Sequence, residues 1–165
     1  MASRRFPIRV GRRSAPLLRI FFGVKADTAY VELTDAPDET DAPSGGADVS
    51  SADRANAPSG TFLARFGWST LETPIANIVS WRIEGPWRWI TAIGVRRSIR
   101  HADVSFGGTP RGGVRVDFRA HPKLGLFHPP ALYVTVDDLE GLAAALKDRV
   151  IPGEDARTRI VPQIP

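Results

Sequence analysis

The sequence predicts a mainly β or α+β domain, an antiparallel sandwich or partly open barrel of about seven strands capped by one C-terminal amphipathic helix. Short runs with alternating apolar residues recur between turn signals through most of the chain. The hydrophobic period changes to that of a helix only near the C-terminus. The chain has 165 residues, of which 42% are hydrophobic, so it is long enough for one domain with its own core.

The expected strands follow from their apolar residues. Residues 19–24 and 29–34 flank a short turn and predict a hairpin. Val114, Val116 and Phe118 alternate with charged residues, which is typical of a half-buried strand. The remaining expected strands cover residues 61–68, 78–84, 89–96, 102–106 and 132–136.

Because side chains alternate along a strand, the sequence also predicts which residues share a face in two of these strands. Trp68 shares an apolar face with Phe66, and Val79 shares one with Trp81 and Ile83.

The helix is predicted by a change of period. Leu139, Leu142, Ala143 and Leu146 fall on one helical face. Asp137, with Glu140 three residues later, predicts a capping box at its start. Pro152 and Gly153 predict its end.

Composition divides the chain into a basic N-terminal segment, residues 1–16, a single β-barrel-like domain, residues 17–150, and a flexible tail, residues 151–165. An acidic insertion at residues 35–60 interrupts the domain. It has no aromatic residue and one large aliphatic residue, Val49, so we expect it to be disordered.

Charge is arranged in blocks. Residues 1–25 carry seven bases and no acid, whereas residues 26–60 carry eight acids and one base. The chain has no cysteine, which fits a reducing compartment, and its apolar N-terminal run is too short for a secretory signal. The expected location is therefore the cytoplasm, with peripheral attachment to a membrane left open.

No motif predicts catalysis, a cofactor or a metal. The three histidines lack ligand spacing and there are no thiols. Ser98, His101 and Asp103 are close in sequence, but on a strand Ser98 and His101 point to opposite faces. The glycine-rich run at residues 107–113 lacks the Lys-Ser/Thr of a phosphate loop. We therefore expect a non-enzymatic protein without a cofactor.

One segment, residues 81–100, combines three of the four tryptophans with five arginines. Its Gly85-Pro86 pair marks a turn, which places indole rings near a loop tip. In one interpretation Trp87 and Trp89 close the barrel end with Arg88 stacked across them. In the other they belong to a binding surface. The candidate surface comprises Trp87, Arg88, Trp89, Arg96, Arg97 and Arg100.

Several segments resemble a family of actinobacterial proteins that has no assigned activity. They are Thr73-Pro74-Ile75-Ala76-Asn77-Ile78, Gly85-Pro86-Trp87-Arg88-Trp89, Ala92-Ile93-Gly94, Gly112-Gly113-Val114 and the run from His128 to Asp137. The resemblance spans residues 17–147 apart from the acidic insertion, and it implies an actinobacterial origin but no function.

The order of strands and helix also resembles bacterial pleckstrin-homology-like domains. Phosphoinositide-binding members of that fold carry a Lys/Arg cluster in the loop that joins their first strands. Here a long inter-strand loop is acidic instead, which counts against phosphoinositide binding.

These observations favour an interaction module that binds a protein partner through the Arg/Trp-rich surface. The alternative is peripheral binding to anionic membrane lipid through the basic N-terminus and the tryptophan tip. A second alternative is a small-ligand-binding barrel or an enzyme with an unrecognised site. Nucleic acid is disfavoured by the acidic insertion and by the lack of a recognisable motif.

Overall fold

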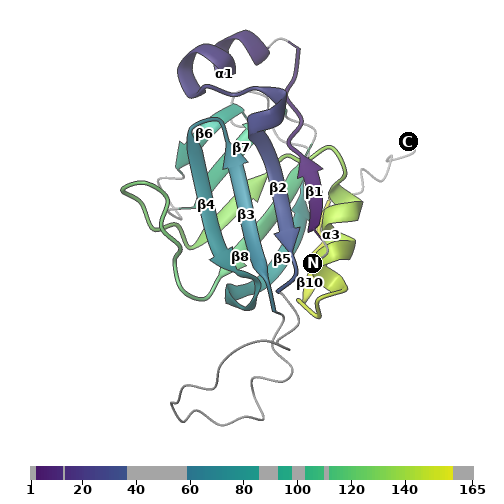
Figure 1. Cartoon of the computed structure of the whole chain (residues 1–165). Coiled ribbons are helices and arrows are strands. Elements are labelled where there is room, and N and C mark those ends of the chain that lie inside the picture. Colours follow the sequence, from purple (N-terminus) through teal and green to yellow (C-terminus); the bar gives the residue numbers. More distant parts are fainter. Residues whose placement is uncertain are drawn as a thin grey trace, which may run out of the picture.

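Two β-sheets face each other in the computed structural model, which describes residues 3–12, 14–36, 59–85, 93–97, 103–109 and 112–157 (Figure 1). The first sheet has the order β1-β2-β3-β4, and all of its neighbouring strands are antiparallel. Its strands are β1 (Ser3–Pro7), β2 (Ala29–Thr34), β3 (Thr61–Phe66) and β4 (Ser69–Pro74).

The second sheet is mixed and has the order β10-β5-β8-β9-β7-β6. The pairs β10–β5 and β7–β9 are parallel, and the others are antiparallel. Its strands are β5 (Ile78–Glu84), β6 (Ile93–Arg97), β7 (Val104–Gly108), β8 (Gly113–Phe118), β9 (Ala131–Val134) and β10 (Gly153–Asp155).

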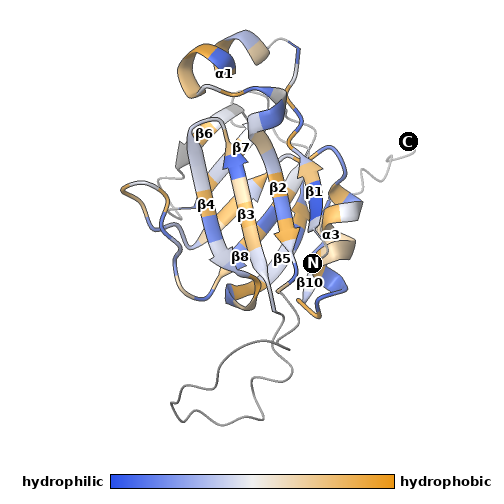
Figure 2. Cartoon of the chain, in the orientation of Figure 1, coloured by the Kyte–Doolittle hydropathy of each residue, from blue (hydrophilic) through white to orange (hydrophobic). Residues whose placement is uncertain are grey.

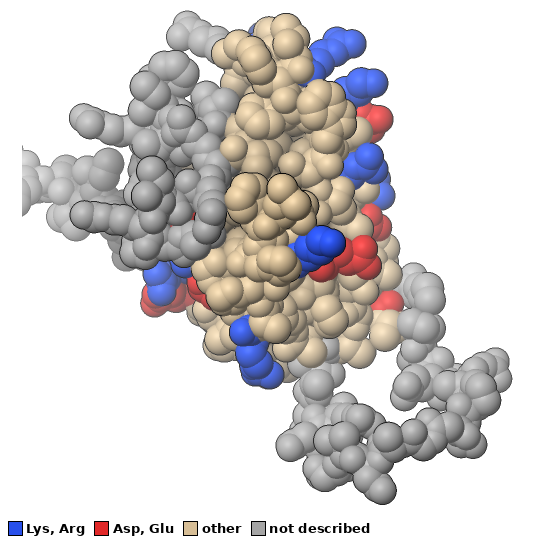
Figure 3. All heavy atoms as spheres, turned by 90° about the vertical axis from the view of Figure 1, so that its left-hand side faces the viewer, with Lys and Arg blue, Asp and Glu red and all other residues tan. Residues whose placement is uncertain are grey.

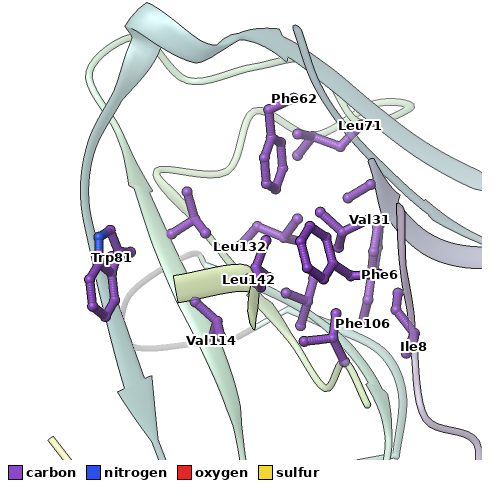
Figure 4. Packing of buried hydrophobic residues seen from close by; sticks show 14 of the residues in the cluster. Phe6, Ile8, Val31, Phe62, Leu71, Trp81, Phe106, Val114, Leu132 and Leu142 are labelled. Atoms are coloured by element: carbon purple, nitrogen blue, oxygen red, sulfur yellow. The ribbon is translucent and has the colours of Figure 1, made fainter. Parts of the chain in front are cut away.

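The core lies between the sheets because each strand directs alternate residues inward. Figure 2 shows this alternation of hydrophilic and hydrophobic residues along β2. Phe62 of the first sheet meets Phe118 of the second edge to face, with ring centroids 6.2 Å apart. Phe66 stacks on Phe106 at 5.7 Å. Figure 4 shows buried side chains from both sheets meeting in this layer.

Helix α3 (Leu139–Lys147) lies beside β1 and β5 (Figure 1). Its apolar stripe is part of the core. Leu142, Ala143 and Leu146 are buried, as the helical period predicts. Its N-cap is Asp138, whose carboxylate accepts a hydrogen bond from the Gly141 N–H at 2.8 Å. The predicted capping by Asp137 is therefore wrong.

The predicted fold class is confirmed: the protein is mainly β, with a C-terminal helix packed on a sandwich. The two sheets stay open and do not close into a barrel. Three further strands, β1, β4 and β10, were not predicted, and β4 pairs with β3 at the edge of the first sheet. β1 falls in the basic N-terminal segment, and β10 in the expected tail, where it extends the second sheet beside Trp81.

The predicted hairpin is wrong in its first strand. Residues 15–22 form helix α1, followed by a 3-10 turn, η1 (Ala26–Thr28), before β2 begins. Pro16 has its φ fixed near the helical value and lies in the first turn. Gly23 ends the helix in the left-handed region at φ 63°, a conformation that favours glycine.

Two predicted face assignments are also wrong, because Trp68 and Val79 do not share the buried face of Phe66 and of Trp81 and Ile83. Trp68 lies in the turn between β3 and β4 and is exposed. Val79 is 42% exposed because the register of β5 against β8 shifts between Ile78 and Ser80. A bulge of this kind turns a side chain to the opposite face of the strand.

The greater part of the acidic insertion, residues 37–58, lies outside the described residues. At its first described residue, Asp35 forms an ion pair with Arg149, which follows α3. The end of β2 is thereby tied to the C-terminal helix.

Candidate interaction surface

The predicted Arg/Trp surface falls outside what the structure describes. Trp87, Arg88, Trp89 and Arg100 belong to undescribed segments, and Arg96 and Arg97 are described only as backbone positions of β6. Binding through these residues remains a prediction.

Helix α1 (Ala15–Phe22) presents an apolar stripe to solvent. Leu17, Ile20 and Phe21 follow the i, i+3, i+4 spacing of one helical face, and they are 57%, 71% and 66% exposed. Leu18, one residue away, is buried against the body. The helix therefore has a buried side and an equally apolar outer side, which a surface helix of a globular protein normally lacks.

Trp68 extends this apolar surface from the adjoining turn. Its indole is 76% exposed and lies against the end of α1, since a Cβ added at Gly23 would meet its Nε1 at 2.4 Å. Its backbone N–H donates to the carbonyl of Phe22 at 3.2 Å. Gly67 enters the turn at φ 60° with its α-carbon against the same carbonyl, so a larger residue there would separate Trp68 from α1.

Beyond Trp68 the apolar surface continues into a hollow of about 540 Å³. Leu126 and Phe127 line it together with Trp68, and Leu126 is 94% exposed. We call Leu17, Ile20, Phe21, Trp68, Leu126 and Phe127 the apolar end face. They are six of the eight large hydrophobic residues that are exposed in the described part of the chain. Figure 3 shows a broad uncharged surface on this side of the molecule, below α1.

Positive charge surrounds the α1 part of this face. Arg12, Arg19 and Lys25 are exposed and line a groove of about 920 Å³ between α1 and the end of β1. The groove also contains Asp137, whose carboxylate accepts from Arg9 Nε at 2.5 Å. Among the residues that the structure describes, no carboxylate lies within ion-pair distance of Arg12, Arg19 or Lys25.

A polar cluster on the outer face of the second sheet is joined by hydrogen bonds among its own side chains. Arg115 donates to Asp103 at 2.6 Å and to Asp117 at 2.9 Å, and Ser80 donates to Asp117 at 3.0 Å. Burial lowers the pKa of Arg115, but the hydrogen bonds and charges of Asp117 and Asp103 outweigh it and leave that pKa raised. Asp117 thus forms an ion pair with Arg115 and at the same time accepts the hydrogen bond from the Ser80 hydroxyl.

The structure does not bring together the other residues that the sequence offers as catalytic or metal-binding candidates. Asp103 belongs to this arginine cluster, whereas Ser98 and His101 lie outside the described residues. His121 and His128 are exposed. Within the described part of the chain, no group of three or more His, Asp or Glu side chains is placed to hold a metal ion.

Comparison of the chain with protein-family models, curated proteins and solved structures gives no match. The resemblances to the actinobacterial family and to pleckstrin-homology-like domains therefore remain predictions.

The apolar end face was not predicted, because the apolar run at residues 19–24 was assigned to a strand. The sequence does contain the start and stop signals of a helix in this region. Pro16 and Gly23 bracket the run as a helix start and stop, and Leu18 and Phe22 are four residues apart. What no pattern indicates is that the Leu17, Ile20 and Phe21 side of this helix stays uncovered.

Proposed function

We propose that this protein is a non-enzymatic interaction module that attaches reversibly to anionic membrane surfaces through the apolar end face. The observation that carries the proposal is the outward apolar stripe of α1, with Trp68 beside it and Arg12, Arg19 and Lys25 around it. A location in the cytoplasm with peripheral membrane attachment is the expectation that fits it.

The residue types match those of helices that lie in a membrane interface. Such helices bury Leu, Phe and Trp side chains at the boundary of headgroups and acyl chains, while Lys and Arg contact anionic headgroups. Indole rings favour this boundary because they are apolar with one polar N–H. Figure 1 shows α1 projecting from one end of the sandwich, where it can meet a flat surface without obstruction by the sheets.

The free energies involved indicate that attachment needs both apolar burial and electrostatic attraction to anionic lipid. Complete burial of one large apolar side chain contributes about 1.5–3 kcal/mol, and the three exposed residues of α1 would be buried only in part. Each Lys or Arg near an anionic leaflet adds about 1 kcal/mol. Neither term alone gives stable attachment, so binding should be reversible, dependent on anionic lipid and weakened by salt.

None of the helices in the described ranges is both long and apolar enough to cross a bilayer. Attachment by the proposed route needs no such helix, because α1 lies at the interface.

A protein partner that binds through Trp87, Arg88 and Trp89 is a separate prediction that rests on the sequence. At the apolar end face we favour lipid because its α1 part forms a ridge that projects from one end of the sandwich (Figure 1). A protein would have to supply a matching groove, whereas a fluid headgroup layer adapts to the ridge.

The test is flotation with neutral phosphatidylcholine vesicles and with vesicles that also contain phosphatidylglycerol. We expect the protein to float only with the anionic vesicles. The variant Ile20→Ser/Phe21→Ser should lose at least about tenfold in affinity, because it removes two apolar contacts. Its thermal stability should stay close to that of the wild type, since both side chains are exposed.

The matched control is Val79→Ser/Val150→Ser. It also removes two exposed apolar side chains, but these lie outside the apolar end face. We expect it to bind vesicles like the wild type. Equal flotation with neutral and anionic vesicles, or equal losses in both double variants, would contradict the proposal.

A further inference from the structure

The groove between α1 and β1 has a composition that the proposed attachment does not by itself require. Diffuse attraction to an anionic leaflet needs only positive charge on the surface. Here the cations line one concave site of about 920 Å³. We therefore infer that the groove is a binding site for the headgroup of a phosphomonoester lipid. This inference rests on the proposed function, because it specifies the lipid that the same end of the molecule contacts.

Charge is the first argument. Among the described residues that line the groove, Arg12, Arg19 and Lys25 contribute three positive charges, and the one carboxylate, Asp137, is already paired with Arg9. The groove thus offers three cations without a described counterion. A phosphomonoester carries about −1.5 to −2 charges near neutral pH, whereas a phosphodiester carries one. The monoester matches the uncompensated charge better.

Donor chemistry is the second argument. A guanidinium presents N–H groups in a fork that bonds two phosphate oxygens at once, and an ammonium adds a compact point charge. Two arginines and one lysine can satisfy the three terminal oxygens of a monoester. The N-terminal residues of α1, Ala15 and Pro16, also line the groove, so the positive end of the helix dipole adds to the same field.

The walls supply the third argument. Val10, Ile20 and Val24 line the groove beside the cations. A free phosphate ion gains nothing from such walls, whereas the glycerol and the first acyl methylenes of a lipid would cover them. Ile20 belongs both to the groove and to the apolar end face. A headgroup held in the groove therefore has its acyl chains next to the exposed ridge of α1.

The experiment compares phosphatidylcholine vesicles that contain phosphatidic acid with vesicles that contain phosphatidylglycerol, adjusted to equal zeta potential. We expect the wild type to bind the phosphatidic acid vesicles at least about tenfold more tightly. Arg12→Gln/Lys25→Gln should abolish this preference. The matched control is Arg65→Gln/Arg119→Gln, which removes the same charge from exposed positions that do not line the groove. It should keep the preference.

A parallel NMR titration with inorganic phosphate and with glycerol 3-phosphate distinguishes a lipid site from a site for a soluble anion. Weak binding of both, with vesicle binding far tighter, supports the inference. Equal binding to both anionic vesicle types, still lost in Ile20→Ser/Phe21→Ser, would overturn the headgroup site and leave membrane attachment standing. No binding to any vesicle, with saturable phosphate binding that Arg12→Gln/Lys25→Gln removes, would overturn both the lipid assignment and the proposed function.

Discussion

At the scale of single residues, Val150 has the least favourable backbone in the described structure. It is the one described residue other than glycine with a positive φ, 61°, and its side chain is 86% exposed. Its neighbour Ile151 donates its N–H to the carbonyl of Leu146 at 3.2 Å, a bond that closes the end of α3. Glycine normally occupies this position, because a β-branched residue is strained in the left-handed region.

Replacement of Val150 by glycine should therefore stabilise the protein. We expect Val150→Gly to raise the free energy of unfolding by about 0.5–1 kcal/mol, measured by urea denaturation, since the strain removed exceeds the entropy cost of glycine. Val79→Gly is the control, because Val79 is also an exposed valine but does not have a positive φ. That variant should be less stable than the wild type. A Val150→Gly variant with unchanged or lower stability would refute the strain argument.

At the scale of elements, β1 depends on one carboxylate of its neighbour β2. Glu32 accepts a hydrogen bond from the Ser3 hydroxyl at 2.5 Å and from the Arg5 guanidinium at 2.9 Å. Arg5 also lies over the Tyr30 ring, 4.0 Å from its centroid. The hydrogen bond from Ser3, followed by that from Arg5 and its charge, lowers the pKa of Glu32 below its usual value of 4.5, against the opposing effect of burial.

This shift predicts a pH-dependent contribution to stability. A carboxylate whose pKa is lower in the folded state stabilises that state above its unfolded pKa, and the contribution disappears as the pH falls through the folded value. Glu32→Gln should therefore be less stable than the wild type at pH 7 by up to about 1 kcal/mol. The difference should vanish in acid, in urea titrations from pH 7 to pH 3. Glu72→Gln, on the exposed side of β4, is the control and should show no such pH-dependent difference. A constant difference for Glu32→Gln across this range would exclude the mechanism.

At the scale of the whole molecule, aromatic contacts join the two sheets. Phe62 and Phe118 meet edge to face, and Phe66 stacks on Phe106, so β3 of one sheet is coupled to β8 and β7 of the other. Helix α3 adds Leu142 and Leu146 to the same core. We expect the sandwich to unfold as one cooperative unit.

Removal of the Phe62 ring should lower the stability of both sheets together. We expect Phe62→Ala to cost about 3–5 kcal/mol, because it leaves a cavity between the sheets. Native-state hydrogen exchange should then report equal losses of protection in β3 and β8. Leu63→Ala, one residue along β3 and facing away from the core, should cost much less. Lost protection confined to the first sheet would show that the sheets unfold separately.

Sequence periodicity by itself determined the parts of the fold in which each segment is buried on one side. The alternation in β8 and the Leu142-Ala143-Leu146 stripe of α3 predicted their type and their inward faces. Where one residue interrupts the period, the prediction was wrong. The bulge at Val79 and the turn at Trp68 reverse a face that strict alternation assigns, and only strand pairing reveals the interruption.

What only the tertiary structure decided is which apolar residues remain uncovered. Leu18 and Phe21 of α1 are both large and apolar, yet one is buried and the other exposed, because only one side of the helix meets the sandwich. The groove has the same origin: Arg12, Arg19 and Lys25 are scattered in sequence and come to line one site only when α1 folds beside β1. Burial and convergence of charge are relations between segments, so composition and period alone do not specify them.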